Sequence, residues 1–246
     1  MQLKDAVTLI TGGGRGIGRA IALRLAAEGA ELHLCARTEK ELAEVSEKIT
    51  KSGGRCNYAI VDVSQFEEVK CFVAKIRAEQ GRIDVLINNA GYCAPLRPVE
   101  EVTDQEYRRT LATNVDSVFH FTRAVLPIMK AKNYGAIVTV SSGCGRRGFP
   151  GLSIYSASKF AVQGLMEAVA AELESTSIRC LLINPGAVAT KMRADLFGQE
   201  EAGRHQSPGV VADVVRCILK EEIEVPNGGG ICIRGGKIAE VYGPGK

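Results

Sequence analysis

The sequence predicts an α/β fold built on a doubly wound parallel sheet of about seven strands, with helices on both faces. Short apolar runs alternate along the chain with longer amphipathic stretches, an order typical of parallel strands joined by right-handed helical crossovers. Within each run nearly every residue is apolar, which is typical of strands buried on both faces. No linker, low-complexity stretch or repeat divides the pattern, so we expect one domain over residues 1–246.

In the first half of the chain, short apolar runs are separated by segments with helical spacing. We expect strands at Val7–Thr11, Glu31–Ala36, Asn57–Val61 and Ile83–Ile87. The first expected helix, Ile17–Glu28, stops before Gly29, because glycine is favoured just beyond a helix end. The next two are Glu39–Thr50, which has apolar residues on one face and charges on the other, and Gln65–Gln80.

The second half repeats the pattern with longer helices. Helical spacing runs from Asp104 through Asn114 to Lys132, and a segment rich in Ala, Leu and Glu predicts a helix over Tyr155–Ser175. The other expected elements are strands at Gly135–Ser141, Ile178–Ile183 and Gly229–Ile233 and a helix at Val210–Glu221. Lys191–Pro208 has the least pattern, and we expect a mobile surface segment there, near the ligand-binding end.

The composition is that of an ordinary globular protein and excludes several classes of function. With 246 residues, 46% of them apolar, the chain needs no disulfide or metal to build a core. Its 31 basic and 28 acidic residues give a net charge of +3, which is too balanced to indicate nucleic acid or a membrane surface as a partner. No apolar run reaches the ~18 residues of a membrane helix, and Met1–Asp5 has no signal-peptide pattern.

Cysteine and histidine give no sign of a metal site. The eight cysteines stand singly and no two form a CxxC pair, so we expect reduced thiols, no bound metal and a cytoplasmic protein. The three histidines are too few for a histidine-based cluster, and we expect each to be structural or solvated.

A glycine-rich segment, Thr11–Gly18 (TGGGRGIG), follows the first strand and opens the first helix. This is the context of a dinucleotide-binding loop, in which glycines let the backbone approach a pyrophosphate and the helix N-terminus offers free N–H groups. The spacing is TGxxxGxG rather than GxGxxG, because the last position of the stricter pattern falls on Ile17. The segment therefore predicts a Rossmann-like nucleotide fold, and the alternative is a glycine-rich turn without a ligand.

The end of the second strand favours NADP(H) over NAD(H). An acidic residue that would bind the ribose 2′-hydroxyl of NAD is missing, since Ala36 takes its position and Arg37 follows. Arg15 lies within the glycine loop, and two guanidinium groups suit the extra charge of a 2′-phosphate. The alternative is that Arg37 merely begins a solvated helix.

Tyr155 and Lys159 form a YxxxK pair, which places both side chains on one helix face. A nearby ammonium favours the phenolate and lowers the pKa of a tyrosine, which fits it for proton transfer with a carbonyl or an alcohol. Ser141 and Ser142 end the fifth strand, at the rim where parallel sheets bind ligands. Alone, these residues are equally consistent with a surface Tyr–Lys pair and a strand-end turn.

Taken together, the motifs resemble those of the short-chain dehydrogenase/reductase family over nearly the full length of the chain. Any one motif is weak, but their order, spacing and strand-end placement are highly specific. The matching residues are Thr11–Gly18, Asp62-Val63, Asn88–Gly91, Asn114, Ser142, Tyr155 with Lys159, and Asn184–Gly186 followed by Thr190.

The resemblance implies roles for these residues. Tyr155 would be the general acid in reduction and the base in oxidation, with Lys159 lowering its pKa and holding the nicotinamide ribose. Ser142, chosen over Ser141 by family spacing, would orient the carbonyl, and Asn114 would support a proton relay. The residues implied to bind NADP(H) are Gly12, Arg15, Gly16, Ile17, Gly18, Arg37, Asp62, Val63, Asn89, Ala90, Gly91, Tyr155, Lys159, Pro185, Gly186, Val188 and Thr190.

The expected substrate pocket is apolar, which favours a ketone or aldehyde with a hydrophobic body. Its expected walls are Tyr92–Leu96, Ser142–Leu152 and Gly186–Phe197. Within them, Arg146 and Arg147 either meet an anionic group or, as we prefer, face solvent.

Two alternative functions stay open beside the NADPH-dependent carbonyl reductase. The first is a 3-oxoacyl-acyl-carrier-protein reductase, whose acidic partner needs a basic docking face. Met129–Lys132 is basic and Glu172–Thr176 is not, which weakens that reading. The second is a non-enzymatic nucleotide-sensing scaffold, which the complete set of Ser142, Tyr155 and Lys159 disfavours.

We also expect a homotetramer or homodimer. The two long helices carry more apolar residues than one sheet face needs, and relatives pair these helices across two-fold axes.

Overall fold

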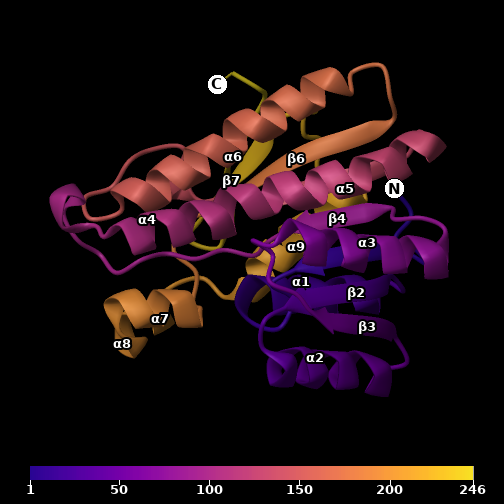
Figure 1. Cartoon of the computed structure of the whole chain (residues 1–246), viewed down its shortest axis with the longest axis horizontal. Helices are drawn as coiled ribbons and strands as arrows, with labels where there is room; N and C mark the ends of the chain where they lie inside the picture. Colours follow the sequence, from indigo (N-terminus) through magenta and orange to yellow (C-terminus); the bar gives the residue numbers. More distant parts are fainter. Residues whose placement is uncertain (246) are drawn as a thin grey trace.

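The computed structural model describes residues 1–245, which form one eight-stranded sheet between two layers of helices (Figure 1). The strand order is β3-β2-β1-β4-β5-β6-β7-β8, parallel throughout except for β8. The strands are β1 (Val7–Thr11), β2 (Glu31–Ala36), β3 (Arg55–Ile60), β4 (Val85–Asn88), β5 (Gly135–Val140), β6 (Ile178–Pro185), β7 (Gly230–Arg234) and β8 (Lys237–Tyr242).

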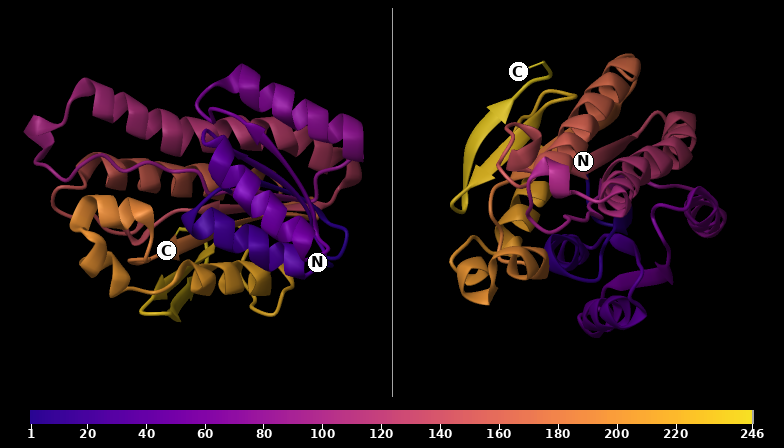
Figure 2. Two further views of the ribbon diagram at one scale, coloured as in Figure 1. Left: turned by 90° about the horizontal axis from the view of Figure 1, so that it is seen from below. Right: turned by 60° about the vertical axis from the view of Figure 1, so that its left-hand side comes forward.

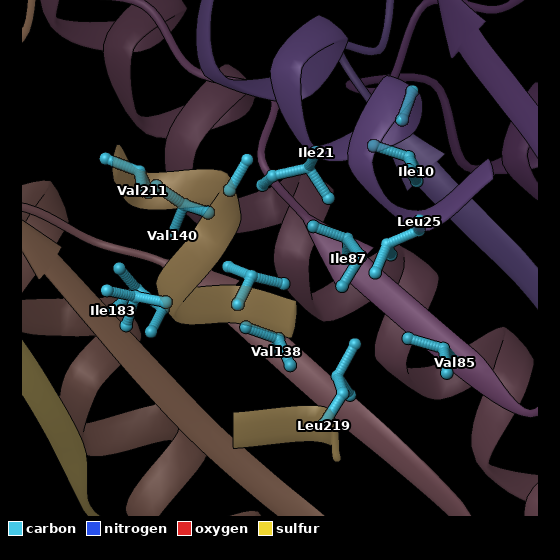
Figure 3. Packing of buried hydrophobic residues seen from close by; sticks show 14 of the residues in the cluster. Ile10, Ile21, Leu25, Val85, Ile87, Val138, Val140, Ile183, Val211 and Leu219 are labelled. Carbon is cyan, nitrogen blue, oxygen red and sulfur yellow. The ribbon is translucent and has the colours of Figure 1, made fainter. Parts of the chain in front are cut away.

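Successive residues of the central strands point to opposite cores, which explains why these strands are apolar at nearly every position. Ile10 and Ile87 pack with helices α1 (Gly16–Ala27), α2 (Glu39–Lys51) and α9 (Pro208–Leu219) on one face. Figure 3 shows part of this cluster around Ile21 and Leu25 of α1. Leu9 and Leu86 pack on the other face with α3 (Phe66–Gln80), α5 (Ser117–Lys132) and α6 (Ser153–Glu172).

The strand order reverses between β1 and β4, and this arrangement determines where a ligand can bind. The chain runs outward from β1 through β2 to β3, then returns to β4 on the other side of β1. Loops leaving the carboxyl ends of β1 and β4 therefore diverge and leave a crevice, the usual ligand site of such sheets. The doubly wound α/β fold predicted from the sequence is confirmed.

The sheet has eight strands, one more than the seven apolar runs of the sequence predict. β8 returns antiparallel to β7 through the two-residue loop Gly235-Gly236, whose φ angles of 56° and 78° favour glycine. Figure 2 shows this hairpin in yellow at the sheet edge opposite β3. A two-glycine loop between strands is a recognised hairpin signal. β8 escaped detection because five of its six residues are exposed and show no alternation.

The long helical pattern from Asp104 to Lys132 is not one continuous helix. It comprises α4 (Asp104–Leu111), a π-helical turn at Ala112–Asp116 and α5. Asn114 is completely buried within this turn. Such turns widen a helix locally and often occur at functional sites.

The segment Lys191–Pro208, expected to be without regular structure, contains two short helices, α7 (Lys191–Phe197) and α8 (Gln199–Gly203). In Figure 1 these helices stand apart from the sheet layers, and residues of α7 border one side of the crevice. Among residues 1–245, no helix combines the length and hydropathy needed to span a membrane.

Candidate active site

Two adjoining hollows open at the carboxyl ends of the central strands. The first, which we call the dinucleotide cleft, follows the glycine loop and the ends of β2, β4 and β5. The second, the substrate hollow, has a volume of about 510 Å³ and lies between the β5–α6 loop and α7. The two meet at residues that line both: Ile17, Ser141, Tyr155, Thr190 and Met192.

The glycine loop is built for close approach of a ligand to the backbone. Gly12 and Gly16 have φ angles of 65° and 55°, which other residues rarely adopt. A Cβ atom on Gly18 would lie 2.2 Å from the carbonyl oxygen of Gly12, so only glycine fits there. No side chain caps the N-terminus of α1 and no acidic residue lies in its first turn, which leaves its N–H groups for an anion.

Asn89 and Ala90, expected to bind NADP(H), also hold the glycine loop in place. The Thr11 hydroxyl accepts hydrogen bonds from the backbone N–H groups of both residues, each at 2.9 Å. In return, Asn89 Nδ2 donates to the carbonyls of Thr11 at 2.9 Å and Gly12 at 3.2 Å. These bonds join the ends of β1 and β4 beneath the cleft. The Thr11 side chain therefore has a structural role that its sequence motif did not predict.

At the far end of the cleft, Arg15 and Arg37 both line the wall, as expected for a 2′-phosphate site. Arg37 is exposed, whereas Arg15 donates to the Glu41 carboxylate at 3.3 Å. Glu41 also lines the cleft and was not foreseen, because it lies on α2, beyond the motifs. Its charge competes with a bound phosphate for Arg15.

Asp62 and Val63 follow β3 at the edge of the cleft. Val63 lines the wall, while the Asp62 carboxylate accepts hydrogen bonds from Ser64 N at 3.0 Å and Ser64 Oγ at 2.7 Å. Burial raises the pKa of Asp62, but the Ser64 bonds and the charges of Arg37 and Arg109 outweigh it, so the net shift is downward. Asp62 is therefore an anion at neutral pH.

Tyr155 and Lys159 lie one turn apart at the start of α6, with Lys159 Nζ 5.7 Å from the centre of the Tyr155 ring. Lys159 is 5% exposed, and its ammonium donates to the carbonyl of Val140 at 3.0 Å. Burial lowers the pKa of Lys159 to about 8. The ammonium is thus held at the junction of the two hollows and stays charged at neutral pH.

The expected lowering of the pKa of Tyr155 is not found in this structure. Burial raises the pKa of Tyr155 and so favours the neutral phenol, although a hydrogen bond with Ser142 acts in the opposite direction. The Ser142 hydroxyl also accepts from Cys144 N at 3.1 Å, which fixes its position beside the phenol. Desolvation is the largest influence on the phenol and outweighs the hydrogen bond with Ser142.

Asn114 lies behind this pair rather than in either hollow. Its Nδ2 donates to the Ser158 hydroxyl and the Tyr92 carbonyl, each at 2.9 Å, and its Oδ1 accepts from Tyr92 N at 2.7 Å. Gly91 lies beside both residues, because a Cβ atom on it would be in van der Waals contact with each, 3.6 Å from Asn114 Oδ1 and 3.8 Å from Lys159 Nζ. The π-helical turn places Asn114 in this position.

The walls of the substrate hollow are mostly apolar. Pro185, Gly186 and Val188 line it, rather than the dinucleotide cleft, while Thr190 borders both. Its other apolar walls are Leu96, Phe149, Pro150, Leu152, Met192, Leu196 and Phe197. Cys93 and Cys144 also line it, and burial raises the pKa of both thiols, that of Cys93 to about 12, so these thiols are neutral.

The arginines near the hollow are already engaged. Arg193 lines it, with its guanidinium 4.3 Å from the centre of the Phe197 ring and hydrogen-bonded to Glu201. Arg147 is exposed, as expected, and lies 5.0 Å from the centre of the Phe149 ring. The expectation that Arg146 faces solvent is wrong, because its side chain is 18% exposed and stacks on Tyr242 at 3.9 Å.

Sequence reasoning missed several residues that border the cleft, among them Thr38, Thr113 and Lys191. Thr113 precedes Asn114 in the π-helical turn, and Lys191 follows Thr190. Their positions beside matched motif residues were the available signal. No group of three or more His, Cys, Asp or Glu side chains among residues 1–245 is arranged to hold a metal ion.

A glycine loop on a helix N-terminus, a switch-point crevice and a Tyr–Lys pair beside an apolar hollow define a nicotinamide-dependent oxidoreductase. The family model for short chain dehydrogenases matches residues 6–201. The chain belongs to this family, whose members are oxidoreductases that act on alcohols and ketones.

Curated relatives span most or all of the chain. It is 38% identical to a 3beta-hydroxysteroid dehydrogenase of Mediterraneibacter gnavus, over 78% of this chain and 69% of the relative. It is 34% identical to the cyclopentanol dehydrogenase of Comamonas sp., over 97% of this chain and 99% of that enzyme. The 3-oxoacyl-[acyl-carrier-protein] reductase of Escherichia coli is 32% identical, over 96% of this chain and 98% of that enzyme.

Solved structures agree with the fold. Levodione reductase superposes with a TM-score of 0.89 at 32% identity, over 95% of this chain and 97% of that chain. A metagenomic short-chain oxidoreductase in complex with NADP has a TM-score of 0.78 at 32% identity, over 89% of this chain and 92% of that chain.

Proposed function

We propose that this protein is an NADP(H)-dependent reductase that interconverts an uncharged ketone or aldehyde and its alcohol. The observation that carries the proposal is the junction of the two hollows. Tyr155 borders the dinucleotide cleft and the apolar hollow at once, with Ser142 bonded to it and Lys159 behind it. A carbonyl group placed there would meet both a proton donor and the nicotinamide end of a cofactor.

The glycine loop, the α1 N-terminus and the Arg15–Arg37 wall would hold the cofactor, which supplies or accepts the hydride when bound. The Tyr155 hydroxyl gives its proton to the carbonyl oxygen during reduction and takes it back during oxidation. Ser142 donates a hydrogen bond to the same oxygen and stabilises its developing negative charge.

Lys159 and Asn114 act behind the reacting atoms. The Lys159 ammonium stabilises the phenolate left on Tyr155 after proton transfer, because opposite charges attract strongly in a poorly hydrated site. Asn114, held by Ser158 and the Tyr92 backbone, would support a water-linked relay behind Lys159 that replaces the proton.

NADP(H) is the favoured cofactor because two arginines follow the ends of β1 and β2 and Ala36 takes the position where an acidic residue would bind the ribose 2′-hydroxyl of NAD. Arg15 and Arg37 line the cleft at that end, and a metagenomic relative was solved with NADP. Glu41 neutralises part of this charge through its bond to Arg15. We therefore assign most of the discrimination to Arg37.

The substrate hollow favours an uncharged, bulky carbonyl compound. Its apolar walls enclose about 510 Å³, and its charged residue Arg193 is paired with Glu201. Three relatives named above are a steroid dehydrogenase, a cyclopentanol dehydrogenase and levodione reductase. We infer an alicyclic ketone as the substrate class, and we place the enzyme with its eight free thiols in the cytoplasm.

A 3-oxoacyl group on acyl carrier protein is the second candidate substrate. It is favoured by the relationship to the Escherichia coli reductase and by the basic end of α5, with Lys130 and Lys132 in its last turn. No basic residue lies in the last turn of α6, which leaves the docking face incomplete.

Oxidation of NADPH by purified protein tests the proposal. The panel contains alicyclic ketones, 3-oxoacyl thioesters and keto acids at equal concentrations. We expect the alicyclic ketones to have the highest kcat/KM. Faster turnover of the thioesters would make the second candidate correct, and no turnover of any carbonyl compound would contradict the reductase itself and favour a nucleotide-sensing scaffold.

A further inference from the structure

Three buried polar side chains lie behind the loop that carries Ser142, and the chemistry described above uses none of them. Gln163 of α6, Asn184 at the end of β6 and Tyr242 of β8 are 7%, 0% and 3% exposed. They come from three elements far apart in the sequence. Burying polar groups is costly unless they are hydrogen-bonded, so this cluster needs an explanation.

The two amides hold the Ser142 loop at both ends. Asn184 Nδ2 donates to the carbonyl of Ser142 at 3.0 Å, and Gln163 Nε2 donates to the carbonyl of Gly145 at 3.0 Å. Between these points lies the single 3₁₀ turn Gly143–Gly145. Because only the N–H end of an amide can donate to a carbonyl, these bonds turn both amide oxygens away from the loop.

The Tyr242 hydroxyl lies between the two amide oxygens. It is 2.6 Å from Asn184 Oδ1 and 2.9 Å from Gln163 Oε1. Gln163 Oε1 also accepts from Asn184 Nδ2 at 2.6 Å, which joins the three side chains into one network. Burial raises the pKa of Tyr242, so this hydroxyl remains a donor over the whole working range of pH.

A glycine on the neighbouring strand leaves the space that the Tyr242 hydroxyl occupies. A Cβ atom on Gly230, the β7 residue paired with Tyr242, would lie 2.6 Å from the Tyr242 hydroxyl oxygen. The Tyr242 ring also contacts the far end of the same loop, because the Arg146 guanidinium lies 3.9 Å from its centre. The hydroxyl and the ring of one residue on the edge strand therefore both act on the loop that holds Ser142.

We propose that Tyr242 is a positioning residue for the reaction, holding Ser142 in its productive place through Asn184 and Gln163. The proposal rests on the function assigned above. Tyr242 is 3% exposed and lines neither hollow, so it can affect the reaction only through the residues that it holds in place. Small displacements of a group that stabilises developing charge cost rate, even when the protein stays folded. β8, the one antiparallel strand among residues 1–245, would thus tune catalysis from the sheet edge.

A double-mutant cycle between Tyr242→Phe and Ser142→Ala tests the proposal. Tyr242→Phe removes one oxygen atom, and we expect kcat to fall about tenfold with unchanged NADPH affinity measured by fluorescence titration. In the Ser142→Ala background the same change should alter kcat less than about twofold, because the residue it positions is gone. Gln163→Met, which removes the bond to Gly145, should repeat this behaviour and replaces Tyr242→Phe if that variant does not fold.

Ile231→Val is the matched control for a purely structural effect. Ile231 is a fully buried neighbour on β7 that packs in the core with α1 and α9, on the sheet face opposite α6, so its variant should lower the Tm and leave kcat unchanged. Equal loss of kcat from Tyr242→Phe in both backgrounds, or wild-type kcat in Tyr242→Phe, would overturn the proposal. A Ser142→Ala enzyme with the wild-type rate would contradict the proposed function as well, which separates the two failures.

Discussion

At the scale of one residue, the buried ammonium of Lys159 lowers the stability of the folded protein. Its ammonium is buried and has one backbone acceptor, the carbonyl of Val140, with no carboxylate bonded to it among residues 1–245. The resulting pKa of about 8 lies below the 10.5 of an exposed lysine. A charge kept in such a place destabilises the fold, and we assign this cost to the role proposed for Lys159 beside Tyr155.

Lys159→Met should therefore make the protein more stable and inactive. At pH 7 we expect the free energy of unfolding to rise by roughly 1–3 kcal/mol, less the hydrogen bond lost at Val140. The folded pKa is depressed, so the penalty in the wild-type protein is full below pH 8 and fades as pH rises toward 10.5. Urea unfolding at pH 7 and pH 10 measures this, and a variant less stable than wild type at pH 7 would contradict it.

Arg37 is the single residue to which we assign the proposed cofactor preference. Arg37→Ala should weaken NADPH binding by roughly ten- to a hundredfold, since a charge-assisted hydrogen bond is lost, and leave NADH binding nearly unchanged. Fluorescence titration with both cofactors measures the effect. Arg77→Ala, an exposed arginine in the last turn of α3, is the control. Equal weakening of both cofactors would remove the 2′-phosphate assignment.

At the scale of elements, the sequence predicted the helices and strands that bury apolar residues. It missed the edge strand β8 and the π-helical turn. The central strands were found because apolar runs such as Val85–Asn88 must be covered on both faces, and β3 was predicted as well although most of it is exposed. β8 was missed because it buries only Tyr242, and its apolar residues Ile238, Ala239 and Val241 neither alternate with polar ones nor form a continuous run. The π-helical turn was missed because one extra residue per turn leaves helical spacing almost intact.

The residues of the candidate site that lie in sequence motifs could be predicted, and those that the fold brings in from elsewhere could not. Motifs located Tyr155, Lys159 and Ser142, since each occupies a fixed strand or helix end. Glu41 and Tyr242 could not be found, because their effect depends on which elements the fold brings together. The downward shift expected for the pKa of Tyr155 was wrong for a related reason, since burial is a property of the folded chain.

The glycine loop and α1 act as one element, and Gly18 decides their fit. Gly18→Ala places a Cβ against the Gly12 carbonyl, so we expect the loop to shift and the Kd for NADPH to rise at least tenfold. The Tm should fall as well. Gly209→Ala on α9 is the control, because its nearest neighbour, Ser207 Oγ, is at an ordinary 3.4 Å. Unchanged NADPH affinity in Gly18→Ala would show that the loop does not cradle the cofactor.

At the scale of the whole molecule, α4, α5 and α6 present an uncovered apolar face. Tyr107, Phe119 and Phe160 are 46%, 45% and 47% exposed there, and Ala168 and Ala171 are exposed on α6. We expect this face to pair with a second copy, as closed symmetric oligomers are the default for soluble chains.

Ala168→Arg should break this pairing, since a bulky charge then lies between two close helices. Light scattering should give the mass of a dimer or tetramer for the wild-type protein and a smaller mass for the variant. Activity should fall too, because Tyr155 and Lys159 begin the same helix. Glu174→Arg, beyond the end of α6, is the control for added charge. A fully active wild-type protein with the mass of one chain at micromolar concentration would contradict the interface.

The central claim is that the Tyr155 hydroxyl transfers the proton, and Tyr155→Phe tests it most directly. The ring remains and only the oxygen that carries the proton is removed. Single-turnover oxidation of bound NADPH by the best ketone of the panel should slow by about 10²–10⁴-fold, while the Kd for NADPH stays within about twofold of wild type. A Tyr155→Phe protein that oxidises NADPH at nearly the wild-type rate would contradict the account.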